Sequence, residues 1–338
     1  MSTASADQPA SRSDKAAVLI TGGSGFIGLN LVETLLERGE RVIVFGPEPQ
    51  NLPSFGAEAA GAYTFTAGDV RDREGVRRAL EDAGADRIIH AAAITAGAAS
   101  EARQFAAVVD VNVAGTVSAL EAARLAGVHR FLFLSSVAVY GRNGFAPGAL
   151  DETDTPPAPQ GLYAITKHAA EQLSLRYGAT HGMSVIAARV GAPFGRWERS
   201  TGVRDTLSAI HQVTALALAG REAVLPSAGR KDWIYAPDIA AALALLLDIP
   251  EPREAVYNVG PGGEWTLEEW CRLLAERHPG FRYCIAERPQ DANVNLYGND
   301  GRSPMAIARL RAETGFAPRF GLQAAFADYM QWIERYGL

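Results

Sequence analysis

A glycine-rich segment, TGGSGFIG (residues 21–28), constrains the fold of this chain more than any other feature. It directly follows AVLIT (17–21), a run typical of a buried strand, and it opens a helical pattern that Gly39 ends. The same rhythm continues in the first half of the chain, with strands predicted at 41–45, 62–69, 86–93, 130–136 and 184–190 and helices near 73–83, 101–126 and 163–180. Strands separated by helical crossovers predict a doubly wound α/β fold, with a parallel sheet covered on both faces.

The rhythm changes after residue 190. A polar loop leads into a helix predicted over 203–219, residues 232–260 resemble a return to the sheet, and shorter helices separated by Pro and Gly follow. We therefore predict a Rossmann domain over 16–190 that 232–260 rejoins, and a smaller C-terminal substrate-binding module formed by 191–231 and 261–338. Residues 1–15 are rich in Ser, Ala, Asp and Pro without an apolar signal-peptide region, and are predicted to be a disordered tail.

Composition excludes several classes of function. Hydrophobic residues make up 48% of the chain and charged residues 21%, which is typical of a soluble globular protein. The net charge is −6 and Lys and Arg form no run, so we expect neither a nucleic-acid nor a membrane partner. The apolar stretch 239–250 is too short to span a bilayer, which predicts a cytoplasmic protein. Cys271 and Cys284 lack metal-ligand spacing, so no metal site is predicted.

The glycine-rich segment also predicts a ligand. Gly22, Gly25 and Gly28 follow the spacing G-x-x-G-x-x-G between a strand and a helix, which allows a tight turn and a close approach of the backbone to a pyrophosphate. The first helical turn, with Phe26 and Ile27, then offers backbone N–H groups and the positive end of the helix dipole. We predict dinucleotide binding at these five residues.

The second predicted strand bears on the choice of cofactor. Gly46 stands where an acid usually binds the ribose 2′-hydroxyl of NAD, Glu48 follows two residues later, and no nearby cation is available for the phosphate of NADP. NAD is therefore predicted, with NADP as the alternative. Asp69 and Val70 are predicted to lie near the adenine edge, although Asp69 also fits a turn or cap. Small residues at Ala91 and Ala92 fit a backbone that lies beside the cofactor.

A proton-transfer group is predicted from two further segments. Tyr163 and Lys167 lie one helical turn apart, and Ser136 lies at the C-terminal end of a strand, the edge at which such sheets bind ligands. The lysine ammonium and an oxidised nicotinamide would both lower the phenol pKa from about 10 toward working pH. Tyr163 would then accept the proton of a substrate alcohol while Ser136 hydrogen-bonds the same oxygen.

Taken in order, the motifs resemble those of one enzyme family. They are TGGSGFIG, GDV, HAAA, N-x-x-G-T from Asn112, SSVAVYG, YAITK, RKDWIYAPDIA, YNVG and RPQD, and they extend from about 17 to 300. The chain resembles an extended short-chain dehydrogenase/reductase of the NAD-dependent epimerase/dehydratase family, with a pattern like that of UDP-glucose 4-epimerases. The resemblance implies that Asn112 supports a proton relay through Lys167. It also implies that Ser136, rather than its inert neighbour Ser135, is catalytic, and that the helices near 101–126 and 163–180 form a homodimer.

Departures from the family pattern bear on the substrate. Val137 and Ala138 replace the Asp-Glu pair that dehydratases of the family carry, so dehydration is disfavoured. Ala192 replaces a nucleotide-contacting Asn and Lys231 an Arg, while Arg288 matches the late arginine of the family. These residues are predicted to bind a carbohydrate-type substrate, and a sugar or sugar-nucleotide epimerase is the favoured reading.

Two other readings stay open. The first is a dehydrogenase of a smaller sugar acid or polyol, its pocket formed by Thr95 and a polar loop that contains Trp197; Trp197 is equally well read as a lid or packing residue. Arg199 and Arg204 fit a solvated surface better than a pocket. The second is a non-catalytic dinucleotide sensor, which is disfavoured because Tyr163 and Lys167 are both present.

Overall fold

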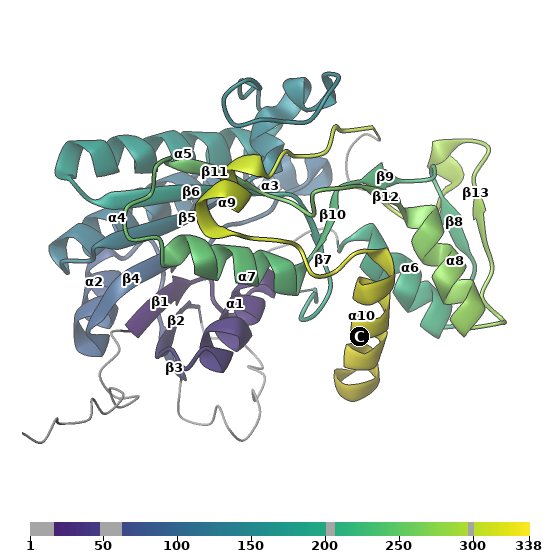
Figure 1. Ribbon diagram of the computed structural model, residues 1–338, viewed down its shortest axis with the longest axis horizontal. Coiled ribbons are helices and arrows are strands. Elements are labelled where there is room, and N and C mark those ends of the chain that lie inside the picture. The colour runs from purple at the N-terminus through teal and green to yellow at the C-terminus, as the bar shows by residue number, and fades with distance from the viewer. Residues whose placement is uncertain (1–16, 48–62, 201–206, 297–300) are drawn as a thin grey trace, which may run out of the picture.

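The centre of the protein is a parallel sheet of seven strands. The computed structural model describes residues 17–47, 63–200, 207–296 and 301–338 (Figure 1). The strands pair in the order β11-β6-β5-β4-β1-β2-β3, and all pairs are parallel. Their bounds are β1 (Ala17–Thr21), β2 (Val42–Gly46), β3 (Tyr63–Ala67), β4 (Ala85–His90), β5 (Arg130–Ser136), β6 (Ser184–Val190) and β11 (Val256–Val259). The predicted doubly wound fold is confirmed.

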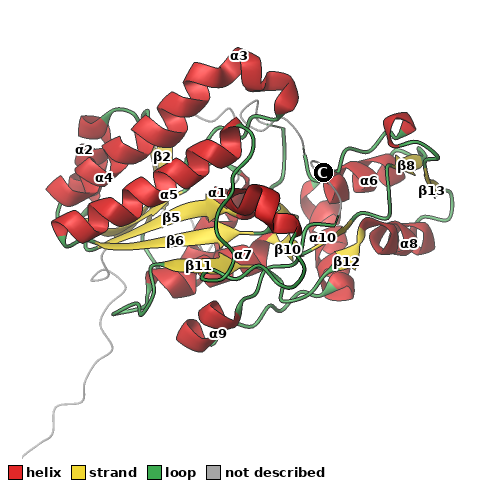
Figure 2. Ribbon diagram, turned by 90° about the horizontal axis from the view of Figure 1, so that it is seen from above, coloured by secondary structure: helices red, strands yellow, loops and turns green. Residues whose placement is uncertain are grey.

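Helices cover both faces of this sheet. Strands bury alternate side chains on opposite faces, so that Val18 and Ile20 of β1 belong to one apolar cluster and Ala17 and Leu19 to another. The first cluster is covered by α1 (Phe26–Glu37) and α7 (Ala236–Leu247), and the second by α2 (Arg73–Ala83), α4 (Gly115–Leu125) and α5 (Leu162–His181). Figure 2 shows α4 and α5 side by side above β5 and β6.

The helix predicted over 101–126 contains an irregular turn. α3 (Ala98–Val109) continues through a π-helical turn, η2 (Asp110–Ala114), into α4. Within this turn, the Asn112 side chain hydrogen-bonds to both backbone groups of Ile94, and the Thr116 hydroxyl donates to the Asn112 carbonyl. Side-chain periodicity cannot reveal such a turn, because these contacts come from a distant loop. π-Turns of this kind often lie at functional sites.

Within the described part of the chain, Ser100–Leu125 is long and apolar enough, by length and composition, to cross a membrane. In this structure its second part, α4, is one of the helices that cover the sheet. Asn112 and Thr116 are buried, and both hydrogen-bond to other parts of the protein. These contacts are typical of a core helix of a globular protein.

A second apolar core lies beside the C-terminal edge of the sheet. It packs around Trp270, Phe194 and Tyr329. The elements that form it are α6 (Ala209–Leu218), α8 (Leu267–Arg277), α10 (Leu322–Tyr336), β8 (Ala223–Leu225) and β13 (Tyr283–Ile285) (Figure 1). Two further small sheets pair β7 (Ala192–Phe194) with β10 (Trp233–Tyr235), and β9 (Arg230–Lys231) with β12 (Trp265–Thr266).

The chain crosses between the two cores more often than the sequence predicts. Residues 232–260 return to the main sheet through α7 and β11, as expected. A second return, which was assigned to the C-terminal module, follows later: α9 (Ala308–Thr314) lies against β11, and Leu310 and Phe316 pack into the α1 and α7 core. The boundary predicted at 261 is corrected accordingly, because these apolar side chains are buried in the Rossmann half.

Candidate active site

The glycine turn is built for a close backbone approach. Gly22 has φ of +68°, and a Cβ atom there would lie 2.8 Å from the Ala92 Cα. A Cβ atom on Gly28 would lie 2.4 Å from the Gly22 carbonyl oxygen. Gly25 begins α1 without a side-chain cap, and the first turn of the helix contains no acidic residue. This cradle fits a dinucleotide pyrophosphate, with the first turn of α1 as its anion-binding end.

The site lies where the strand order reverses. β1 runs between β2 and β4, so the chain continues outward in opposite directions from this point. The carboxyl ends of β1 and β4 meet there: Ala91 donates its N–H to the Thr21 carbonyl, and the Thr21 hydroxyl lies 2.8 Å from the His90 Nδ1. A crevice at such a reversal is the usual ligand site of an open α/β sheet. A cofactor contact of Ala91 and Ala92 beside this crevice stays a prediction.

The end of β2 can accept a larger side chain than it has. A Cβ atom on Gly46 would lie 3.9 Å from the Ser24 Oγ, which is an ordinary contact distance. The backbone therefore leaves room for a Cβ atom at position 46, where the acid usually stands. Glu48, the predicted substitute, lies outside the described residues. Asp69 accepts hydrogen bonds from the backbone and guanidinium of Arg71, which lower the pKa of its carboxyl, and Val70 packs below Gly115. These contacts are those expected of Asp69 as a turn residue, which was the alternative to a position near the adenine edge.

Tyr163 and Lys167 lie in the first two turns of α5. The Glu101 carboxylate of α3 accepts the Leu162 N–H at 3.0 Å and so caps this helix from outside. Lys167 is 3% exposed, with its Nζ 4.4 Å from the centre of the Phe133 ring on β5. Burial lowers the pKa of Lys167 to about 7, and the Glu171 charge acts in the opposite direction. The lysine is therefore a buried amine whose charge depends on its neighbours.

Asn112 joins the π-turn to the helix that carries this pair. Its side-chain Nδ2 donates to the Thr166 hydroxyl at 3.1 Å, and that hydroxyl donates to the Tyr163 carbonyl at 3.0 Å. The structure thus places Asn112 against the turn of α5 between Tyr163 and Lys167. A role for Asn112 in a proton relay stays a prediction.

The two serines at the end of β5 have different partners. Ser136 begins the short helix η3 (Val137–Phe145), where its Oγ accepts the Ala138 N–H at 3.2 Å. Ser135 is buried and donates to the Glu171 carboxylate at 2.6 Å. This contact makes the Ser135 hydroxyl one of the hydrogen-bond donors to a fully buried carboxylate, and it does not test the expectation that Ser135 matters little for activity.

The predicted substrate residues lie at several places around this edge. Thr95 and Ala192 are half-buried, on the segment after β4 and on β7. The Lys231 ammonium is buried and donates to the Leu296 carbonyl, 5.4 Å from the Trp233 ring centre. Arg288 is exposed and pairs with Asp291 at 2.8 Å. Substrate contacts of these four residues stay predictions.

Trp197 has a packing position. It is 8% exposed, stacks edge-on against Trp332 of α10, and donates its Nε1–H to Glu33 of α1 at 3.2 Å. This placement corrects its assignment to the substrate pocket. Its neighbour Arg196 pairs with Asp328 of α10, and Arg199 is half-buried. Arg204 lies outside the described residues.

Sequence reasoning missed a set of buried polar residues next to the predicted site. They are His90, Glu171 and Arg189, each buried to at least nine-tenths. Glu171 follows Lys167 by four residues, a spacing that already predicts a shared helix face. His90 and Arg189 carried no comparable signal, because their partners are far away in the sequence. In the ranges that the structure describes, no group of three His, Cys, Asp or Glu side chains could hold a metal ion.

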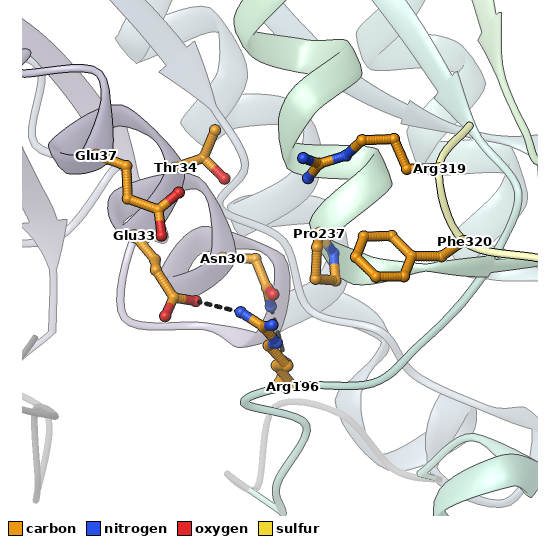
Figure 3. Close-up of a pocket in the computed structure, with 8 residues that line it drawn as sticks. All are labelled: Asn30, Glu33, Thr34, Glu37, Arg196, Pro237, Arg319 and Phe320. Atoms are coloured by element: carbon orange, nitrogen blue, oxygen red, sulfur yellow. Dashed lines mark hydrogen bonds and ion pairs between the residues drawn. The ribbon is translucent and has the colours of Figure 1, made fainter. Parts of the chain in front are cut away.

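A cavity of about 240 Å³ opens elsewhere on the surface, between α1, the start of α7 and the segment before α10 (Figure 3). Glu33 and Glu37 lie on one side and Arg319 and Phe320 on the other. Burial raises the pKa of Glu33, which lies 3.7 Å from Arg196. None of the predicted catalytic or cofactor residues lines this cavity, so it is separate from the candidate active site.

Known proteins match the chain over most of its length. A family model described as the NAD dependent epimerase/dehydratase family matches residues 18–260. A dTDP-glucose 4,6-dehydratase of Streptomyces niveus is 30% identical over 333 residues, which covers 94% of this chain and 92% of the relative. A 3-beta-hydroxysteroid dehydrogenase of Mycolicibacterium neoaurum is 38% identical over 364 residues, which covers 96% and 93%. The solved structure of MoeE5 in complex with UDP-glucose and NAD superposes with a TM-score of 0.77 at 27% identity and covers 95% of this chain and 99% of that one.

Proposed function

The chain belongs to the NAD-dependent epimerase/dehydratase family, and from this premise we propose that it oxidises a secondary alcohol of a sugar or sugar nucleotide, most simply as an epimerase. The observation that carries the proposal is the joint presence of the glycine cradle after β1 and of Tyr163 and Lys167 on α5, next to the strand end with Ser136. MoeE5, solved with UDP-glucose and NAD, supports both the cofactor and the substrate class.

The residues of the chain divide the chemistry among them. Bound NAD supplies a hydride acceptor at the substrate carbon. Tyr163 accepts the hydroxyl proton, and the Lys167 ammonium stabilises the phenolate that this requires. Ser136 already accepts the Ala138 N–H, so its own proton is available for the substrate oxygen. Gly22, Gly25 and Gly28 hold the pyrophosphate, and Ala91 and Ala92 form the wall beside it.

Epimerisation is preferred to dehydration because of two residues after Ser136. Val137 is 8% exposed and Ala138 is half-buried, and neither has a group that can move a proton to a leaving hydroxyl. Relatives such as the Streptomyces niveus enzyme are named as dehydratases, so the distinction has a direct test. Incubation with dTDP-glucose should give no 4-keto-6-deoxy product by NMR. Accumulation of that product would overturn the preference.

A dehydrogenase is the second candidate. The relative that is 38% identical is named as a dehydrogenase of a steroid, a substrate without a diphosphate. The Lys231 ammonium, predicted to bind the substrate, donates instead to the Leu296 carbonyl. Both observations favour a smaller or less charged substrate with net formation of NADH.

One experiment separates the two candidates. Purified protein is denatured and the released cofactor is measured. UDP-glucose and UDP-galactose, and separately a panel of sugar acids and polyols, are then offered with and without added NAD, while NADH absorbance and sugar stereochemistry are followed. An epimerase retains its NAD and interconverts the two sugars without net NADH. A dehydrogenase needs added NAD and produces NADH in proportion to product. Tyr163→Phe is the control, and neither activity in the unmodified protein would overturn the proposed sugar-nucleotide chemistry.

A further inference from the structure

A buried ion pair lies one helical turn beyond Lys167. The Glu171 carboxylate is fully buried, and Arg189 of β6 binds it through two hydrogen bonds, Nε to Oε2 at 3.1 Å and Nη2 to Oε1 at 2.7 Å. Arg189 itself is 4% exposed. Removing two charges from water is costly, and a pair of this kind persists only with good geometry and additional hydrogen bonds. The position of this pair beside the candidate site therefore calls for a functional explanation.

Glu171 also binds the strand that carries Ser136. The Ser135 hydroxyl donates to the Glu171 Oε2 at 2.6 Å. Ser135 and Arg189 are direct partners in the pairing of β5 with β6, so both reach the carboxylate from neighbouring strands. The next residue after Ser135 is Ser136. One carboxylate thus links the end of β5 to the face of α5 that carries Lys167.

The far side of the ion pair is equally fixed. The Arg189 guanidinium lies 4.8 Å from the centre of the Tyr140 ring. The Tyr140 hydroxyl donates to the Asn258 Oδ1 at 2.8 Å, and the Asn258 N–H donates to the Glu152 carboxylate at 2.7 Å. Arg189 is therefore held from β11 and η3 as well, and the Glu171 carboxylate has little freedom to move.

Few charged or titratable groups lie around Lys167. On α5 these groups are Tyr163, one turn before Lys167, and Glu171, one turn after it. From β4, buried His90 is neutral, because burial and, second, the Lys167 charge lower its pKa to about 3. Arg189 of β6 and His168, whose Nδ1 is 3.9 Å from Glu171 Oε1, lie against the carboxylate. β5 presents the Phe133 ring and η2 the uncharged Asn112. Glu171 is thus the carboxylate that favours the charged form of Lys167.

We propose that Glu171 is a positioning residue of the active site: held by Arg189 and Ser135, it places a carboxylate one helical turn from Lys167 and fixes the end of β5 on which Ser136 lies. It acts through these two residues and does not touch the substrate. The inference rests on the proposed role of Lys167 in proton transfer, but its central step, the charge coupling between Glu171 and Lys167, can be measured without any substrate.

The sequence makes that measurement simple, because its lysines are Lys15, Lys167 and Lys231 alone. Protein labelled with ¹³Cε-lysine is titrated by NMR, and Lys167→Met assigns the Lys167 signal. In the unmodified protein this signal should titrate near pH 7. In Glu171→Gln it should move to lower pH, while Glu121→Gln, which removes a half-buried carboxylate from α4, should leave it in place. Where Glu171→Gln does not fold with Arg189 unpaired, Glu171→Gln/Arg189→Met is compared with Arg189→Met, because these two variants differ only in the carboxylate; the Lys167 signal should titrate at lower pH in the double variant.

Kinetics test the second half of the proposal. Glu171→Gln should lower kcat at least about tenfold with little change in KM, because it alters the proton route rather than substrate binding. Ser135→Ala should lower kcat without moving the Lys167 titration, because the carboxylate keeps its charge. A Lys167 signal that titrates in Glu171→Gln as in the unmodified protein would overturn the inference. Full activity of Lys167→Met would instead overturn the proposed function and leave the measured coupling intact.

Discussion

Tyr163 is the residue on which the proposed chemistry depends most. It lies in the first turn of α5, whose N-terminus is held by Glu101 and whose following turn is held by Asn112 through Thr166. Both contacts are made through backbone or hydroxyl groups other than the phenol. Tyr163→Phe therefore leaves both of these contacts in place.

Tyr163→Phe should reduce turnover by roughly two to four orders of magnitude, because it removes the proton acceptor and keeps the ring. Steady-state kinetics on the substrate found by the cofactor assay measures this, and circular dichroism checks that the fold is retained. Ser136→Ala should cost less, since it removes one hydrogen bond to the reacting oxygen. Near-full turnover of the phenylalanine variant would mean that the proton leaves by another route.

His90 is the second residue with a measurable signature. Its ring lies between the Thr21 and Thr116 hydroxyls, and burial lowers its pKa to about 3, so it stays neutral in the folded protein. An unfolded chain binds a proton at this histidine below about pH 6.5, and the folded protein does not. Between these two values the unfolded state therefore gains protons as pH falls, and the protein loses stability.

We expect this single group to contribute a slope of up to about 1.4 kcal/mol per pH unit to the unfolding free energy between pH 6.5 and 3. Urea unfolding across this range should show a shallower acid loss in His90→Gln than in the unmodified protein. His129→Gln, which changes an exposed histidine, is the matched control and should keep the steep loss. Equal slopes in all three proteins would refute a buried neutral His90.

At the scale of elements, the end of β2 decides how the cofactor ribose is recognised. The strand ends at Gly46, beside the glycine turn, and a side chain there would meet Ser24 at ordinary contact distance. An acid at this position could reach the ribose hydroxyls of NAD and would repel the additional phosphate of NADP. Position 46 thus lacks an acidic side chain whose Cβ atom the backbone can accommodate.

Gly46→Asp should tighten NAD binding and widen the preference for NAD over NADP, by about tenfold or 1.4 kcal/mol if one good hydrogen bond is gained. Isothermal titration with both cofactors measures it. Gly46→Ala is the control, because it adds a side chain without a carboxylate and should leave the ratio unchanged. If the aspartate variant binds NADP as tightly as the unmodified protein does, the ribose is bound elsewhere.

Elements also show what periodicity can and cannot predict. The strands β1 to β6 and the helix α2 were predicted to within a few residues, because each is a short apolar run or a well-capped helical pattern; Asp72 and Gly84 cap α2 at its two ends. The π-turn in the helix predicted over 101–126 was missed. It depends on the two hydrogen bonds between Asn112 and Ile94, and the sequence does not show that these residues meet.

At the scale of the whole molecule, one helical surface remains incompletely covered. Large apolar side chains on α3, α4 and α5 are 39% to 55% exposed, namely Phe105, Val117, Leu125, Ile165 and Leu173. α4 and α5 lie side by side (Figure 2), so these side chains gather on the helices through which the homodimer is predicted. Exposed apolar surface of this kind is typical of an interaction face.

We expect a homodimer at micromolar concentration, and Leu173→Glu should shift it toward monomer because a carboxylate would be buried in the predicted contact. Sedimentation velocity gives the result. Leu245→Glu on α7 is matched in residue type, helical setting and exposure, at 37% against 41%, and should remain dimeric. If the unmodified protein sediments as a monomer, the predicted homodimer is wrong.

The candidate site was predictable where its parts lie in continuous motifs. The glycine turn, Tyr163 and Lys167 follow from local spacing alone. The link among Glu171, Ser135 and Arg189 does not, because it depends on the register that places Ser135 opposite Arg189 on the next strand. Trp197 was misplaced for a similar reason: its partners Trp332 and Glu33 lie on helices at opposite ends of the chain.

The repeated crossing of the chain between its two cores fixes the order in which a ribosome can complete them. When β6 has been made, the strand that pairs with its outer edge, β11 at 256–259, has not yet been synthesised. The core beside β11 is completed only later, by Leu310 and Phe316. The second apolar core is completed later still, because it contains residues of both α6 and α10, and α10 begins at Leu322. Neither half can close during synthesis before nearly the whole chain has emerged. A nascent chain that stalls after α8 would carry exposed apolar surface on both halves, and would be a target for chaperones rather than a folded fragment.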